Sequence, residues 1–266
     1  MNIFELTSAS SGYGTTDVIR DMDLTIGQGD FLGIIGPNGS GKSTLIKMLS
    51  GILPLQRGKV QLHGKEIELY EQKELARMMS MVPQFFENII SFPVKDFIIS
   101  GRFPYKNFWD GNTGDDIKKV NEAIEITGIE HIRDRSITEL SGGELQLVSI
   151  ARALVQNSDL LLLDEPLSNL DLNHSIHIMD ILHGLNSRGS TIIMVLHDIN
   201  LASDYCSRII ALKDGSIFTD GTPEESIEID TIKKLYNTHC SIEKNPVTGK
   251  PCVYPHPGYD KRRNNE

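Results

Sequence analysis

One segment constrains this chain more than any other: Gly36-Pro37-Asn38-Gly39-Ser40-Gly41-Lys42-Ser43-Thr44. It fits the phosphate-loop pattern G-x-x-x-x-G-K-[ST]. Its glycines let the backbone curl so that successive N–H groups point at one anion, and a helix from about Ser43 adds its positive dipole end. Lys42 supplies a charge for the β- and γ-phosphates, and the Ser43 hydroxyl can bind Mg²⁺. The segment therefore predicts a nucleotide-binding site.

The residues on either side of this loop supply the strand and the helix that the motif requires. Residues 31–35 are an apolar run that predicts a buried strand, and residues 44–49 continue as a helix. Farther along, residues 160–163 and 191–196 are continuous apolar runs, as expected of parallel strands covered on both faces. A mostly parallel sheet is therefore predicted around the phosphate loop.

Shorter patterns add strands at both ends of the chain. Residues 17–20 and 24–26 alternate apolar and polar side chains, which predicts short antiparallel strands. Residues 64–66 are typical of a turn. Lys213-Asp214-Gly215 separates two apolar runs, which is a hairpin signal.

The stretch from residue 86 to residue 158 has a different character. It holds helical patterns at 117–127 and 143–156, together with an aromatic loop. Elsewhere strands alternate with helices, including a helix predicted from about residue 173 to residue 187, which indicates an α/β core. We therefore predict an α/β fold: a P-loop NTPase core with a mostly parallel sheet, an N-terminal antiparallel β subdomain and a helical insertion. The aromatic loop residues are Phe103, Tyr105, Phe108 and Trp109.

A single domain is expected over residues 1–260. Changes of pattern within it separate a nucleotide-binding core, a helical subdomain and a C-terminal extension, and a flexible tail follows. These parts span residues 1–85 with 159–225, then 86–158, 226–260 and 261–266, in that order.

Charge and hydropathy exclude several classes of protein. The formal net charge is -10, which argues against nucleic acid as a partner because such binding depends on a basic surface. No apolar run approaches the roughly 20 residues that cross a bilayer, and the first residues lack a signal-peptide pattern. We therefore expect the protein in the cytoplasm or on the cytoplasmic face of a membrane.

Polar residues follow three further predicted strands: Gln84, the pair Asp164-Glu165, and His197. Ligands collect beyond the carboxyl ends of parallel strands, so these side chains are expected at the phosphate loop. Asp164 is placed to hold Mg²⁺, and Glu165 to polarise the attacking water. His197 can hydrogen-bond the γ-phosphate and hold Glu165 in place. Gln84 can reach the metal or the water through its amide.

A second phosphate-binding device follows at residues 140–144, Leu-Ser-Gly-Gly-Glu. Ser141 is a good N-cap, and Gly142 and Gly143 expose N–H groups at a helix N-terminus. One nucleotide does not obviously need both devices. If the second serves a nucleotide held by another copy of the chain, the catalytic unit is a head-to-tail pair.

As a set, these motifs resemble those of ATP-binding cassette (ABC) ATPases, in the family's order and over about residues 3–225. The phosphate loop resembles the Walker A motif, residues 160–165 the Walker B strand, and residues 140–144 the signature motif. Glu144 and Leu147 depart from the family, where glutamine and arginine are commoner. The remaining matches are Ser168-Asn169-Leu170-Asp171 with the D-loop, Gln84 with the Q-loop, His197 with the switch histidine, and Tyr13 with the aromatic residue that stacks on adenine.

The resemblance implies a mechanism in which two copies of the chain close on two ATP molecules with Mg²⁺. Each ATP would lie between residues 36–44 of one copy and Ser141, Gly142 and Gly143 of the other. Asp171 would cross the interface and communicate between the sites. The implied metal ligands are Ser43, Gln84 and Asp164, and the chemistry is positioning plus electrostatics.

The region after Gln84 resembles that of importers for ferric siderophores, heme and cobalamin, in which a Gly-Arg-x-Pro element recurs. Here the element reads Gly101-Arg102-Phe103-Pro104, and residues 196–202 and 246–251 are also similar to that group. The resemblance implies the peripheral ATPase subunit of a metal-chelate importer. Its helical insertion would dock on integral membrane permease subunits, and an external substrate-binding protein would act indirectly.

Other readings of the same motifs remain open. Molybdate or tungstate importers share much of this architecture. A soluble, non-transport ABC ATPase of DNA repair or translation usually has a long heptad insertion or two tandem cassettes, and the sequence has neither. An adaptor that binds ATP without hydrolysing it is opposed by Glu165 and His197. An exporter ATPase is less favoured by the region after Gln84.

Overall fold

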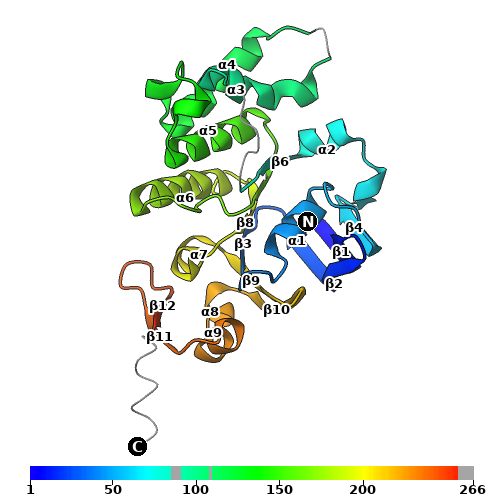
Figure 1. Cartoon of the computed structure of the whole chain (residues 1–266), viewed down its shortest axis with the longest axis vertical. Helices are drawn as coiled ribbons and strands as arrows, with labels where there is room; N and C mark the ends of the chain where they lie inside the picture. Colours follow the sequence, from blue (N-terminus) through cyan, green and yellow to red (C-terminus); the bar gives the residue numbers. More distant parts are fainter. Residues whose placement is uncertain (85–90, 108–109, 257–266) are drawn as a thin grey trace, which may run out of the picture.

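A six-stranded sheet lies at the centre of the computed structural model, which describes residues 1–84, 91–107 and 110–256 (Figure 1). The strand order is β10-β9-β3-β8-β7-β6. The pairs from β9 to β6 are parallel, and β10 joins antiparallel through the predicted hairpin. The mostly parallel sheet is therefore confirmed. Its strands are β3 (Phe31–Ile35), β6 (Met79–Val82), β7 (Leu160–Leu163), β8 (Thr191–Val195), β9 (Arg208–Lys213) and β10 (Ser216–Gly221).

A second, antiparallel sheet forms at the N-terminus, in the order β2-β1-β4-β5. The prediction of two short strands at 17–20 and 24–26 is wrong, because both belong to one strand, β2 (Thr16–Gly27), paired along β1 (Asn2–Tyr13). The apparent break is an irregularity at Asp21, which has a φ of 42° and whose N–H donates to Ser10 Oγ. The other two strands are β4 (Arg57–Leu62) and β5 (Lys65–Glu66).

Residues 64–66 also differ from their prediction. Lys65 and Glu66 extend as β5 and pair with β4, and the chain turns just before them. The positive φ angles of His63 (49°) and Gly64 (77°) mark that turn. The polar residues of this segment therefore belong partly to a turn, at residues 63–64, and partly to the edge strand β5.

Helices cover both faces of the central sheet and gather at one end of the molecule (Figure 1). The predicted helices at 117–127, 143–156 and 173–187 are confirmed, as α4, α5 and α6. Five short helices of the described ranges, α2, α3, α7, α8 and α9, were not predicted. The helices are α1 (Lys42–Leu49), α2 (Gln72–Met78), α3 (Val94–Ile99), α4 (Gly114–Thr127), α5 (Gly142–Val155), α6 (Leu172–Asn186), α7 (Ile199–Tyr205), α8 (Pro223–Ser226) and α9 (Ile229–Tyr236).

Two hydrophobic cores lie on opposite faces of the central sheet, because side chains of a strand point alternately to its two faces. In β3, Phe31 and Ile35 enter the core shared with α5, α6 and α7. Leu32 and Ile34 enter the core shared with α1 and the N-terminal sheet. The sheet is thus held rigidly from both sides, and its carboxyl edge is a fixed platform.

The C-terminal part of the described chain folds as a hairpin, β11 (Cys240–Lys244) with β12 (Pro251–Pro255). The hairpin packs on α7: Asn200 exchanges hydrogen bonds with the Val253 backbone, and Ser203 Oγ donates to Pro251 O at 2.6 Å. Within the described ranges, no helix combines the length and apolar character that a bilayer crossing needs. The aromatic residues Phe108 and Trp109 and the expected tail 261–266 lie outside the described residues.

A buried ion pair joins α4 to the 3-10 helix Ser100–Tyr105 at the helical end of the molecule. Arg102 Nε donates to Asp116 Oδ1 at 2.9 Å, and both side chains are almost completely buried. Burial alone opposes ionisation of Asp116. Hydrogen bonds from the Thr113 backbone and hydroxyl, from Arg102 and from Lys106 outweigh burial and hold the pKa of Asp116 well below its usual range.

Replacing this carboxylate tests its weight in the fold. Asp116→Ala leaves the buried Arg102 guanidinium without its carboxylate partner, so we expect the free energy of unfolding in urea to fall by about 3–5 kcal/mol. Since the folded-state pKa is depressed, the stabilisation is present above the unfolded pKa of about 4 and is lost as pH falls. The variant should therefore lose less stability on acidification than the parent. Asp115→Ala, at the exposed neighbouring site, serves as control, and equal unfolding of the two variants would contradict this.

Candidate functional site

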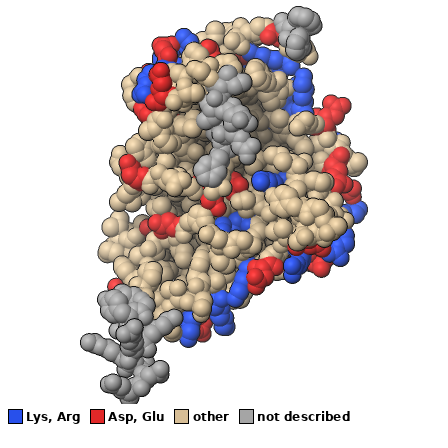
Figure 2. Space-filling view, in the orientation of Figure 1, with Lys and Arg blue, Asp and Glu red and all other residues tan. Residues whose placement is uncertain are grey.

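The carboxyl edge of the parallel sheet opens into a cleft of about 560 Å³. The segments that follow β3, β6, β7 and β8 meet there, as their parallel pairing requires. In Figure 2, acidic and basic side chains of this face of the molecule lie mainly along its edges. The cleft is lined by Tyr13, Val18, Asn38, Gly39, Gly41, Lys42, Ser43, Thr44, Gln84, Glu165 and His197.

The phosphate loop is folded as a cradle between β3 and α1. Gly36 has a φ of 148°, and a Cβ there would lie 2.3 Å from Leu212 O, so no side chain fits. The Lys42 ammonium donates to Gly36 O at 2.9 Å and Pro37 O at 3.1 Å, which closes the loop. Burial lowers the pKa of Lys42, against the pull of Glu165 and Asp164. Among the described residues, Ser40 Oγ is buried and without a hydrogen-bond partner, which suits a loop that receives an anion.

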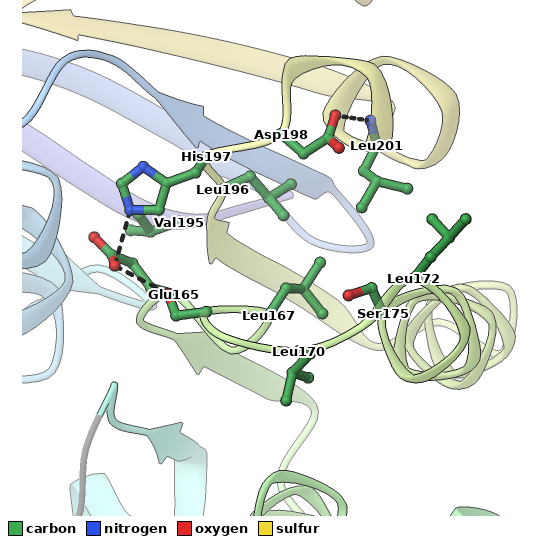
Figure 3. Close-up of a pocket in the computed structure, with 11 residues that line it drawn as sticks. Glu165, Leu167, Leu170, Leu172, Ser175, Val195, Leu196, His197, Asp198 and Leu201 are labelled. Carbon is green, nitrogen blue, oxygen red and sulfur yellow. Dashed lines mark hydrogen bonds and ion pairs between the residues drawn. The ribbon is translucent and has the colours of Figure 1, made fainter. Parts of the chain in front are cut away.

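Three donors converge on one oxygen of Glu165. Gln84 Nε2 donates to Glu165 Oε2 at 2.5 Å, His197 Nε2 lies 2.8 Å from it, and Ser168 Oγ donates at 3.2 Å. The predicted pairing of His197 with Glu165 is thus present (Figure 3). Glu165 also has a positive φ of 50°, a conformation that non-glycine residues adopt rarely. The carboxylate is therefore held in one orientation at the cleft.

The predicted magnesium ligands lie beside this carboxylate. Ser43 Oγ donates to Asp164 Oδ1 at 2.8 Å, so the first turn of α1 touches the end of β7. Burial raises the pKa of Asp164, and the Ser43 hydrogen bond and the nearby lysines oppose that rise. Hydroxyl, carboxylate and amide oxygens are the ligands that Mg²⁺ prefers. Ser43, Asp164 and Gln84 therefore form a donor set that fits this ion.

Of the predicted nucleotide-binding residues outside the phosphate loop, four do not line the cleft: Ser141, Gly142, Gly143 and Asp171. They lie at the starts of α5 and α6. Ser141 caps α5 in a capping box, in which Glu144 N donates to Ser141 Oγ and Ser141 N donates to Glu144 Oε2. Glu144, one of the two departures from the family pattern, thus completes the cap with its carboxylate. Leu147, the other, is buried in the core.

A smaller cavity of about 290 Å³ lies behind Glu165. Figure 3 shows Leu167, on the segment that follows Glu165, on one side of this cavity, and Leu196 and Leu201, on either side of His197 and Asp198 in the sequence, on the other. Leu167, Leu170 and Leu201 line it, together with His197. The segment that follows Glu165 and the segment that carries His197 therefore border one largely apolar cavity.

Sequence reasoning missed two contributors to the site. Ser168 bonds Glu165 from three residues along the chain, a spacing that follows from the turn closed by Ser168 N and Glu165 O. Val18 lines the cleft from β2, beside Tyr13 of β1. The position of Val18 at the cleft was missed because the N-terminal strands were expected to be short and separate.

Comparison with known proteins gives the class. A family model described as "ABC transporter" matches residues 19–168. The chain belongs to the ABC transporter family, as an ATP-binding subunit whose ATPase activity is coupled to transport. The resemblance drawn from the sequence is therefore confirmed.

One curated relative and two solved structures illustrate which members of the family this chain is similar to. The ferric enterobactin transport ATP-binding protein FepC of Escherichia coli (strain K12) is 38% identical over 245 residues, which cover 92% of this chain and 90% of FepC. A metal-chelate type ABC transporter in an inward-facing conformation has a TM-score of 0.83 over 97% of this chain and 98% of that one; its 24% identity shows the fold alone. A bacterial ABC transporter cassette solved as a dimer has a TM-score of 0.74 at 28% identity, over 82% of this chain and 98% of that one.

Removing the loop lysine tests the nucleotide site. Lys42→Ala takes away the buried positive charge and the two bonds that close the loop, so we expect ATP binding to weaken by at least about tenfold. Isothermal titration with ATP measures the change. Lys118→Ala, on the exposed face of α4, is the control. Unchanged affinity and turnover in Lys42→Ala would contradict the assignment.

Proposed function

We propose that this chain hydrolyses ATP in a dimer of two copies and thereby drives uptake of a metal chelate of the ferric-siderophore type. One observation supports the dimer: the groups suited to phosphate are divided between the cleft and the starts of α5 and α6, which do not line it. A second copy, turned head to tail, supplies the missing half of each site. The dimeric cassette of similar fold supports this arrangement.

Within each site, the residues of one copy have distinct roles. Residues 36–44 bind the triphosphate, with Lys42 at its β- and γ-phosphates, and Tyr13 stacks on the adenine. Glu165 orients and polarises the attacking water, while Gln84, Ser168 and His197 hold its carboxylate. Ser43, Gln84 and Asp164 would hold Mg²⁺, which neutralises charge on the phosphates. Ser141, Gly142, Gly143 and Asp171 come from the other copy.

The cargo is inferred from similarity along nearly the whole chain. FepC, whose name assigns it to ferric enterobactin transport, aligns over 92% of this sequence. The proposed assembly therefore has a membrane permease that contacts this subunit on the cytoplasmic face and an external protein that captures the chelate. A molybdate or tungstate importer is the alternative cargo class.

The site assignment predicts the behaviour of Glu165→Gln. The amide keeps the shape of the side chain but cannot accept a proton, so we expect kcat to fall by about 100-fold to 10,000-fold. ATP would still bind, and the variant should accumulate as an ATP-bound dimer. Phosphate release and light scattering measure the two effects. Parent-like turnover in this variant would exclude Glu165 as the group that activates water.

The proposed permease contact predicts a second effect. Phe103 (65% exposed) and Tyr105 (38% exposed) present aromatic surface beside the buried Arg102. Phe103→Ser with Tyr105→Ser should reduce uptake of radiolabelled ferric chelate by cells and leave basal ATPase activity unchanged. Phe218→Ser, at a similarly exposed aromatic residue (39%) of β10, is the matched control.

The same cells distinguish the two cargo classes. Loss of molybdate uptake with normal iron-chelate uptake would support the alternative importer. Normal uptake of both in the Phe103, Tyr105 double variant would place the permease contact elsewhere.

A further inference from the structure

His174 lies in the first turn of α6 and is bonded twice to Asp171. The Asp171 carboxylate caps the helix: its Oδ1 accepts from His174 N at 2.8 Å. The ring nitrogen Nδ1 lies at 2.8 Å from the same oxygen. These bonds hold the pKa of Asp171 below its usual value. His174 therefore holds the Asp171 side chain in place, and Asp171 is the residue that contacts the partner copy in the proposed function.

The Cδ2 side of the same ring lies against Gly143 of the signature motif. α5 and α6 run side by side (Figure 1), and a Cβ built on Gly143 would lie 2.8 Å from His174 Cδ2 and 3.0 Å from Cγ. Gly143 has an ordinary backbone φ, so it is the ring that requires a glycine here. The imidazole therefore occupies the space beside the N-terminus of α5 that any larger residue would need.

We propose that His174 is a positioning residue that fastens the Asp171 loop to the signature end of α5. The two elements that complete the partner's ATP site then approach it as one rigid unit. This inference rests on the proposed two-copy site. It predicts that His174 acts on closure of the dimer, because it lies outside the cleft in which one copy binds ATP.

The chain contains a matched comparison residue one helical turn later. His177 also faces the helical end of the molecule, but its Nε2 lies near Thr127 O, at 3.5 Å, and near Gly128. Neither Thr127 nor Gly128 belongs to the proposed interface between the two copies. A histidine that merely joins α6 to the helices packed on it would behave like His177.

The experiment uses the full chain with the Glu165→Gln substitution, because we expect this variant to accumulate as an ATP-bound dimer. Three variants separate the two side-chain contacts, and all of them keep the backbone bond from His174 N to Asp171. His174→Phe keeps a ring but loses the side-chain bond to Asp171, His174→Asn keeps a donor but loses the ring, and His174→Ala loses both. His177→Ala is the control. Sedimentation measures the dissociation constant of the ATP-bound dimer, and titration with a fluorescent ATP analogue measures nucleotide affinity of the monomer.

We expect His174→Ala to weaken the ATP-bound dimer by about tenfold or more, because a charge-assisted hydrogen bond and a packing contact are both lost. The Phe and Asn variants should each fall between the parent and His174→Ala. Monomer affinity for the analogue should stay within about twofold of the parent in every variant.

Three results would overturn the inference: a parent-like dimer in His174→Ala, equal weakening in His177→Ala, or a parallel loss of monomer nucleotide affinity. These are distinct from failure of the proposed function. If the Glu165→Gln parent binds ATP and stays monomeric, the two-copy site itself is wrong.

Discussion

The hydrogen-bonded register of the parallel strands is the constraint on which the whole site depends. Val82 pairs with Leu163, Leu163 with Met194, and Ile34 with Val195. The carboxyl ends of β3, β6, β7 and β8 are therefore aligned along one edge of the sheet. Gln84, Glu165 and His197 each follow within three residues of the end of β6, β7 and β8, respectively. A slip of one residue would reverse the face of every side chain in a strand. The two buried cores on either face of the sheet prevent such a slip.

The Glu165 carboxylate shows what this rigidity accomplishes. Its backbone has a strained positive φ, and such strain persists only where the surroundings determine the conformation. The donors on Oε2 come from three separate segments, which follow β6, β7 and β8. Because they converge on one oxygen, the direction of the other is fixed relative to the phosphate loop. Precise placement of a water nucleophile is what phosphoryl transfer requires of the protein.

The sequence predicted those parts of the site in which a polar residue follows a buried apolar strand directly. Asp164, Glu165 and His197 belong to this class, since spacing along the chain fixes their position at the sheet edge. The continuous strand β2 was missed because a positive φ at Asp21 resembles a turn in local composition. The contact of His174 with Gly143 joins residues far apart in sequence. Only the packing of α6 beside α5 brings them together.

The fold also explains why the proposed ATP site needs two copies of the chain. The cleft is built on the central sheet, whereas the signature helix belongs to the helical end and begins away from it. At that start, the capping box engages the N–H groups of Ser141 and Glu144. The N–H groups of Gly142 and Gly143 lie outside this exchange and are the donors that suit an anion. A helix start organised in this way, yet remote from its own phosphate loop, gains a role in hydrolysis only when a second chain brings a nucleotide to it. Catalysis then depends on association, and association is the step that a transporter can couple to movement of its permease.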